Sequence, residues 1–291
     1  MKTYIECVPC IVEQAVEAPR RFTGDEQLIE RVVKRTIAEL VDFDFARSPP
    51  EMGGVLHRIM SDELGDEDPY LEDKRRANRL AIELLPELRR FVESADDPFE
   101  AAVRLAIAGN VIDFGAPGGL RDDRIELAFR DTADVLLRGD GAAGVERLRR
   151  QAARAERILF LADNAGEIVV DRLLIERFPR GSVTVVVRSG PAINDALLED
   201  AEQAGLGEVA EVIESGADLP GTPLAFCSAD LRERFAAADL VVSKGQGNYE
   251  TLSDEQRRMF FLLRAKCPVV AGHMSCEVGD YAVAEFPRSE R

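Results

Sequence analysis

Residues 158–167 read ILFLADNAGE, a short apolar run that passes directly into a polar turn. The run from Ile158 to Leu161 has no alternation of apolar and polar residues, which is typical of a strand covered on both faces. A helical pattern follows at 169–177. A strand, a short loop and a helix in this order indicate a βαβ unit. The stretch therefore predicts an α/β fold for this part of the chain.

The same order recurs through the second half of the chain. Further β-rich runs lie at 183–187, 209–213, 240–242 and 268–271, and further helical patterns lie at 197–205 and 255–265. Strands that alternate with helices in this way predict a buried, mainly parallel sheet.

Residues 1 to about 108 have a different pattern. Apolar residues recur at helical spacing across 28–41 and 77–92, and no run resembles a strand. Pro86 is expected to kink or interrupt the second of these helices. We therefore predict a helical domain at 1–108 and an α/β domain at 109–291.

The composition excludes several classes of protein and partner. Asp and Glu total 54 against 37 Lys and Arg, a net charge of −17 over 291 residues, so nucleic acid is not expected as a partner. No uncharged apolar run reaches the roughly 18–20 residues of a membrane helix. The N-terminal MKTYIECVPC shows no secretory signal, and five Cys do not indicate a disulfide framework. A cytoplasmic protein is therefore expected.

Polar loops after the predicted strands carry the candidate metal ligands. Open α/β sheets bind ligands beyond the carboxyl ends of their strands. Asp163 and Asn164 follow the first run and Asp195 follows the second. Their hard oxygen donors favour Mg²⁺ or Mn²⁺ over zinc. Each residue is also a good cap for the helix after it, so the loops indicate a site as a set rather than singly.

Two further features suggest an anion at the same edge of the sheet. Lys244 is one of only five Lys and follows the run at 240–242, where a flexible cation suits a phosphate oxygen. The amides at the start of the helix near Gly166 are expected to point into the same space. Arg188, after the second run, is a weaker candidate because 32 of the 37 basic residues are Arg.

A Cys pair and one polar residue have more than one interpretation. Cys7 and Cys10 have the spacing of a zinc-binding or redox pair, so they are a possible second metal site. A four-Cys zinc site needs two more ligands, and Cys267 and Cys276 are the candidates. The competing interpretation is structural packing against the C-terminal segment. Asn110 either follows a helix end or faces the site from the domain junction.

With these motifs in order, the sequence resembles the DUF89 family, the damage-control phosphatases with an ARMT1-like metal-binding domain. The resemblance is to the stand-alone prokaryotic branch with an N-terminal Cys pair. The matching segments span nearly the whole chain and are Cys7–Cys10, Asp68–Tyr70 with Lys74, Gly109–Asp113, Asp163–Glu167, Gly190–Asp195 and Lys244–Glu250.

The resemblance implies a three-layer α/β/α core with a mainly parallel sheet, and a mainly helical N-terminal region. It implies a divalent-metal phosphatase, active with Mn²⁺, Co²⁺, Ni²⁺ or Mg²⁺, that hydrolyses small phosphorylated metabolites such as sugar phosphates or damaged cofactor precursors. The metal ligands of the family fall on Asp163, Asn164 and Asp195, and its phosphate-contacting lysine falls on Lys244.

These residues form a hypothesis for phosphoryl transfer, which needs charge stabilisation and in-line positioning. Lys244 and the amides near Gly166 hold phosphoryl oxygens, and Glu167 and Asn110 are further substrate contacts. The nucleophile is either water activated by the ion or Asp163. Two alternatives remain at this point: an S-adenosylmethionine-dependent carboxyl methyltransferase, disfavoured by the single Gly in 163–167, and a non-catalytic protein that binds a metal and a phosphometabolite.

Overall fold

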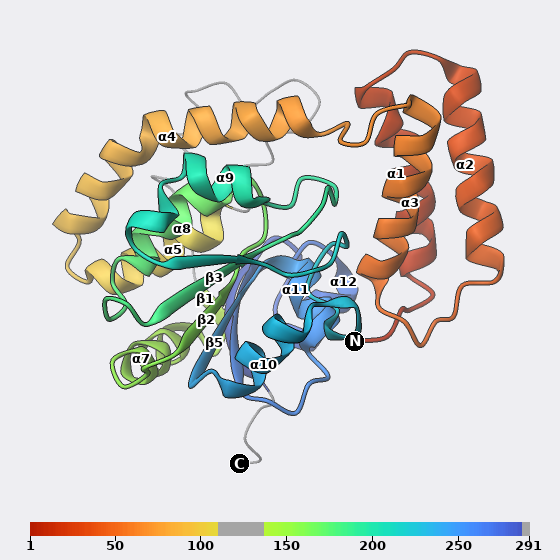
Figure 1. The fold of residues 1–291 in the computed structure, drawn as a ribbon. Helices are drawn as coiled ribbons and strands as arrows, with labels where there is room; N and C mark the ends of the chain where they lie inside the picture. The colour runs from red at the N-terminus through yellow and green to blue at the C-terminus, as the bar shows by residue number, and fades with distance from the viewer. Residues whose placement is uncertain (110–136, 287–291) are drawn as a thin grey trace.

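The computed structural model describes residues 1–109 and 137–286. Its N-terminal part is helical, as predicted (Figure 1). The helices are α1 Cys7–Glu17, α2 Glu26–Val41, α3 Pro49–Leu64, α4 Leu71–Ser94 and α5 Pro98–Ala108. Capping side chains mark the start of several of these helices. The Asp25 carboxylate, for example, accepts hydrogen bonds from the amides of Gln27 and Leu28 at the start of α2.

The described residues also form a seven-stranded sheet. Its strands are β1 Leu137–Gly139, β2 Ile158–Leu161, β3 Val183–Val187, β4 Glu211–Glu214, β5 Leu240–Lys244, β6 Met259–Arg264 and β7 Tyr281–Phe286. Their order across the sheet is β1-β7-β6-β5-β2-β3-β4. Every neighbouring pair is parallel except β6 and β7. The predicted mixed α/β fold with a mainly parallel sheet is confirmed.

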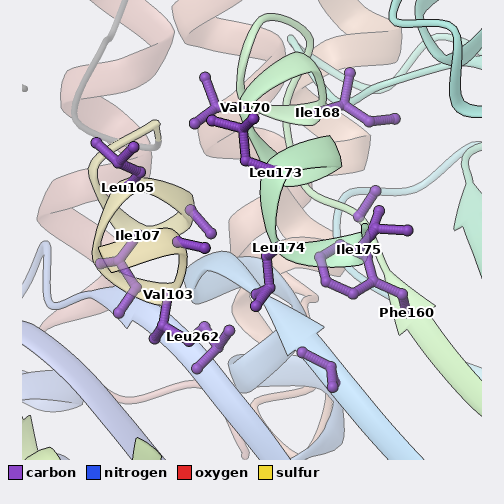
Figure 2. Packing of buried hydrophobic residues seen from close by; sticks show 14 of the residues in the cluster. Val103, Leu105, Ile107, Phe160, Ile168, Val170, Leu173, Leu174, Ile175 and Leu262 are labelled. Atoms are coloured by element: carbon purple, nitrogen blue, oxygen red, sulfur yellow. The ribbon is translucent and has the colours of Figure 1, made fainter. Parts of the chain in front are cut away.

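Helices cover both faces of this sheet. They are α7 Gly141–Ala152, α8 Glu167–Ile175, α9 Leu198–Gln203, α10 Ala229–Ala237, α11 Gly245–Leu252 and α12 Pro268–Met274. Successive strand residues alternate between two cores, so that Phe160 packs with α5, α7 and α8 and Leu161 packs with α10, α11 and α12. Figure 2 shows the first core, in which Leu174 of α8 lies among apolar side chains.

The N-terminal helices divide into two groups by their packing. Helices α1, α2 and α3 share an apolar cluster of their own, which includes Val32, Leu56 and Ile59. Helices α4 and α5 instead contribute to the first core of the α/β region, through residues such as Ala81 and Ile107. In Figure 1, α4 accordingly runs from the α1–α3 bundle back over the sheet. The boundary at residue 108 stays a prediction.

Two of the predicted elements are wrong. The run at 268–271 begins helix α12 rather than a strand, because Pro268 fits the first helical turn and the Cys267 sulfur accepts a hydrogen bond from the Val270 amide. The helical pattern at 255–265 contains β6, whose apolar residues are buried on both sides. Short apolar runs do not separate buried strands from buried helices by periodicity alone. Strands β1 and β7 were not predicted.

Pro86 does not end its helix, and α4 continues through it to Ser94. The helix curves along its length, as Figure 1 shows. Across the described ranges, no helix has both the length and the apolar character needed to cross a membrane.

Replacing Leu174 by Ala should destabilise the protein strongly, because its side chain is fully buried between α8 and the sheet. We expect Leu174→Ala to lower the free energy of unfolding by about 2–5 kcal/mol in urea denaturation. Ile37→Ala on α2, where the residue is 45% exposed, is the control and should change it by less than about 0.5 kcal/mol. Equal losses would contradict this position of the core.

Candidate active site

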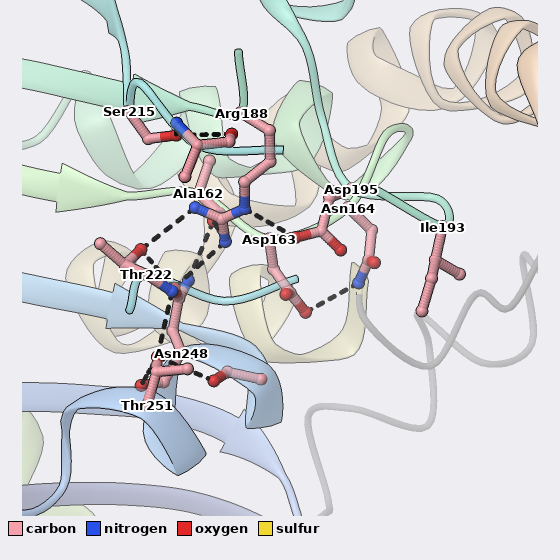
Figure 3. Close-up of polar contacts among 12 residues, drawn as sticks. Ala162, Asp163, Asn164, Arg188, Ile193, Asp195, Ser215, Thr222, Asn248 and Thr251 are labelled. Atoms are coloured by element: carbon pink, nitrogen blue, oxygen red, sulfur yellow. Dashed lines mark hydrogen bonds and ion pairs between the residues drawn. The ribbon is translucent and has the colours of Figure 1, made fainter. Parts of the chain in front are cut away.

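The three predicted metal ligands lie together at one edge of the sheet. The loops after β2 and β3 are joined by an antiparallel bridge between Asn164 and Asp195. The Ala196 amide donates to the Asp163 carbonyl at 2.8 Å, and the Ala165 amide donates to the Asn194 carbonyl at 3.0 Å. These backbone bonds fix the two loops side by side, so that Asp163, Asn164 and Asp195 are neighbours (Figure 3).

Arg188, a weak candidate in the sequence, is a central residue of this edge. It is 1% exposed, and its Nε donates to Asp195 Oδ2 at 2.7 Å. Its other nitrogens donate to the Ala162 carbonyl, to Thr222 Oγ1 and to Asn248 Oδ1. The guanidinium therefore donates its hydrogen bonds to groups of the protein itself, and it orients Asp195 rather than facing a ligand.

Asp163 is held in an electrostatically unfavourable position. Its Oδ2 accepts a hydrogen bond from Asn164 Nδ2 at 2.8 Å. Burial, followed by the charges of Glu167 and Asp195, raises the pKa of Asp163 to about 8. Burial also raises the pKa of Asp195, although Arg188 opposes this shift. Both carboxyl groups would be stabilised in their charged form by a cation between them.

The residues at this edge fit a divalent metal ion. Asp163 and Asp195 are 7% and 5% exposed, and with Asn164 they supply oxygen donors of the kind that Mg²⁺ and Mn²⁺ prefer. Within 1–109 and 137–286, no group of three or more His, Cys, Asp or Glu side chains is arranged to hold a metal. The proposed set differs from such a group because its third donor is the amide of Asn164.

A cavity of about 270 Å³ opens beside Asp163, Asn164 and Asp195. Its walls come from helices α1, α3 and α11, from the start of α12, and from the loops that follow β2, β3, β4 and β6. The described lining residues are Glu6, Cys7, Cys10, Ile11, Gln14, Pro49, Pro50, Gly53, Asp163, Asn164, Ile193, Asp195, Pro220, Gly221, Gln246, Gly247, Glu250, Lys266, Cys267, Pro268 and Val269. The helical bundle thus closes the site from the side opposite the sheet.

Lys244 does not lie on the wall of this cavity. Its side chain is 0% exposed, and its Nζ lies 2.5 Å from both Glu167 Oε1 and Asp171 Oδ1. Although burial acts to lower it, the charges of Asp171 and Glu167 raise the pKa of Lys244. In this conformation the ammonium group donates to two buried carboxylates and to the Ala106 carbonyl, so its predicted contact with a phosphate stays a prediction that would need these hydrogen bonds to change.

The predicted role of the Gly166 amide also needs correction. This amide donates to Asn78 Oδ1 at 2.7 Å, and Asn78 in turn donates to Asp200 on α9. A side chain of α4 therefore occupies the group that was expected to bind an anion. Asn110, the remaining predicted contact, lies outside the described residues.

Lys266 is a candidate that no sequence pattern indicates. It is the one Lys or Arg among the described residues that line the cavity, and it is exposed. Its charge acts to lower the pKa of Asp163 and of Glu250. The scarcity of Lys was a usable signal, but it directed attention to Lys244 because only that residue follows a predicted strand.

The Cys pair lies in the cavity rather than in a separate site. Cys7, Cys10 and Cys267 all line it, and all three are free thiols. The Cys267 sulfur accepts from Gln246 at 3.5 Å. The structure thus brings the pair close to the C-terminal segment through Cys267, while a role as a second metal site stays a prediction.

Comparison with known proteins finds relatives over nearly the whole chain. The model of the damage-control phosphatase ARMT1-like domain matches residues 3–282. A damage-control phosphatase of Pyrococcus horikoshii is 34% identical over 284 residues, 96% of each chain. One of Archaeoglobus fulgidus is 35% identical over 286 residues, 96% of this chain and 98% of its own. An uncharacterized protein of Methanocaldococcus jannaschii is 36% identical over 286 residues, 94% of this chain and 92% of its own.

A solved structure has the same fold. The crystal structure of a DUF89 family protein from Pyrococcus horikoshii superposes with a TM-score of 0.85 at 32% identity. The match covers 98% of this chain and 99% of that chain.

Replacing Gly245 by Ala should disturb Asp163 directly. Gly245 has a φ of +76°, and a Cβ there would lie 1.9 Å from Asp163 Oδ2. Gly181 has a φ of +77° with nothing within 4 Å of such a Cβ, so Gly181→Ala measures the backbone strain alone, about 1–2 kcal/mol. We expect Gly245→Ala to cost about 1–3 kcal/mol more in urea denaturation. Equal costs would show that the carboxylate is not confined by this glycine.

Proposed function

The chain belongs to the damage-control phosphatase ARMT1-like family and is a phosphatase, and we propose that it hydrolyses small phosphorylated metabolites with the help of a divalent metal ion. The observation that carries the proposal is the bridge between Asn164 and Asp195, which sets three oxygen donors on the wall of one cavity. A volume of about 270 Å³ suits a small phosphate ester rather than a macromolecule.

Asp163, Asn164 and Asp195 would hold the ion, and Mn²⁺, Co²⁺, Ni²⁺ and Mg²⁺ are the candidates. When bound, the ion neutralises phosphoryl charge and lowers the pKa of water toward neutrality. Arg188 keeps Asp195 oriented through its 2.7 Å hydrogen bond. Asp163 lies next to Asn164 and is either a ligand alone or also the nucleophile.

The other predicted site residues take supporting roles in this proposal. Lys244 forms ion pairs with both Glu167 and Asp171 in the buried layer below the site and offsets part of their charge. Glu167 Oε2 accepts from Asn164 Nδ2 at 3.0 Å, so this layer orients the amide of the proposed ligand. Lys266 replaces Lys244 as the cation that approaches the phosphoryl group from the cavity wall.

The two alternative functions have weaker support. The methyltransferase hypothesis gains nothing from the loop at 163–167, where Gly166 is the single glycine and its amide is used by Asn78. A non-catalytic binding protein would bind the metal and the phosphometabolite without turnover, so an activity assay separates it from the phosphatase.

We predict metal-dependent hydrolysis of p-nitrophenyl phosphate. Activity should appear with Mn²⁺, Co²⁺, Ni²⁺ or Mg²⁺ and disappear with EDTA, because the charged oxygen donors need the ion to stabilise the phosphoryl group. Asp195→Asn should lower kcat/KM by roughly 100-fold or more, since it removes one ligand charge. Asp140→Asn, in an ion pair with Arg147 on α7, is the control. Activity that persists in EDTA would refute the metal proposal.

Replacing Lys266 by Ala should weaken substrate binding. Loss of the one described cation on the cavity wall is expected to raise KM about tenfold, equivalent to about 1.4 kcal/mol. The effect should shrink at high salt because the residue is exposed. Lys34→Ala, which removes an exposed Lys paired with Glu30 on α2, should leave KM unchanged. An unchanged KM in the Lys266 variant would remove this residue from the site.

A further inference from the structure

Ile193 connects the loop after β3 to the helical bundle. Its side chain packs against the apolar cluster of α1, α2 and α3 and also lines the cavity. Helix α3 approaches it closely, since a Cβ at Gly53 would lie 3.9 Å from Ile193 Cδ1. One side chain of the α/β region is thus inserted between the bundle and the site.

The backbone of Ile193 is in an unfavourable conformation. Its φ is +55°, and Ser275 is the only other non-glycine residue with positive φ in the part of the chain described. A β-branched side chain strongly disfavours this region, so the conformation persists only because the surroundings impose it. Such residues gather where a loop must present a functional group in one direction.

A side chain of the bundle holds the same residue from α3. The Ile193 amide donates to His57 Nδ1 at 3.4 Å. His57 is buried, and burial lowers its pKa, which favours the neutral imidazole that a hydrogen bond to Nδ1 requires. The anchor at Ile193 therefore combines an apolar contact with a long hydrogen bond.

The chain direction set at Ile193 leads directly to Asp195. The Asp195 amide donates to the Ala192 carbonyl at 3.1 Å, which closes a turn around Ile193. The bridge to Asn164 begins at the end of this turn. Without the positive φ, the loop would leave in another direction and the backbone bridge between Asp195 and Asn164 would not form.

We propose that Ile193 is a positioning residue through which the α1–α3 bundle fixes the direction of the Asp195 carboxylate and so the geometry of the metal site. The inference rests on the proposed function in one respect, the role of Asp195 as a ligand. Arg188 holds the carboxylate from the sheet, and Ile193 holds the same loop from the bundle.

The test compares Ile193→Ala with Ile59→Ala. Both changes remove the same atoms at the same apolar cluster, but Ile59 is buried within it and Ile193 is only partly buried against it, so Ile59→Ala should lower the melting temperature of the metal-free protein at least as much as Ile193→Ala does. The first readout is hydrogen exchange of the Asp195 and Ala196 amides in metal-free protein. The second is the dissociation constant for Mn²⁺, measured by calorimetry.

We expect Ile193→Ala to accelerate exchange of these two amides by about tenfold or more and to weaken Mn²⁺ binding by about tenfold, the usual effect of losing a group that orients a ligand. Ile59→Ala should change both quantities by less than about twofold. Ile193→Leu keeps the apolar anchor without β-branching and should bind Mn²⁺ as the unchanged protein does.

Equal effects of Ile193→Ala and Ile59→Ala on exchange and affinity would overturn the proposal, because they would reduce Ile193 to an ordinary core residue. Failure of the unchanged protein to bind any of Mn²⁺, Co²⁺, Ni²⁺ and Mg²⁺ would refute the proposed function instead. In that case the exchange comparison in metal-free protein still decides whether Ile193 positions the loop.

Discussion

The buried guanidinium of Arg188 is the constraint on which the site depends. It contacts the Asp195 carboxylate, the carbonyl at the end of β2, and side chains of Thr222 and Asn248. A charge that is 1% exposed is tolerated only when its hydrogen bonds are satisfied. The planar guanidinium holds five N–H donors in a fixed geometry and meets four acceptors here, one more than the three N–H groups of a Lys ammonium could each serve. The strand ends therefore cannot shift independently of one another.

A second buried cation, Lys244, stabilises the layer beneath. It joins β5 to two carboxylates of α8, Glu167 and Asp171, and burial raises the pKa of Asp171 to about 7 despite this partner. Breaking such a group by removing one partner is costly, because it leaves the others buried and charged. The site thus rests on polar contacts as well as on apolar packing, because the buried ammonium and carboxylate groups stabilise one another where water is excluded.

The sequence predicted the sheet edge better than the cavity. Strand, polar loop and helix follow one another within short stretches of sequence, so this pattern alone places Asp163, Asn164 and Asp195 at the sheet edge. Strand β6 was predicted as a helix and helix α12 as a strand, because a fully buried strand and a short buried helix have the same apolar pattern. Lys244 was assigned to a phosphate because the pattern places it at a strand end but does not reveal the two carboxylates. Walls formed by α1 and α3 depend on long-range packing, for which no local signal exists.

The cavity has a further consequence for the order in which the molecule is built. Its walls combine residues 6–14 and 49–53 with residues 246–250 and 266–269. During synthesis from the N-terminus, α1 and α3 emerge long before residues 246–269, against which they form the cavity. Contacts of such large sequence separation slow folding, because a long loop must close before they form. The cavity is therefore expected to form late in folding, after the C-terminal strands of the sheet have formed.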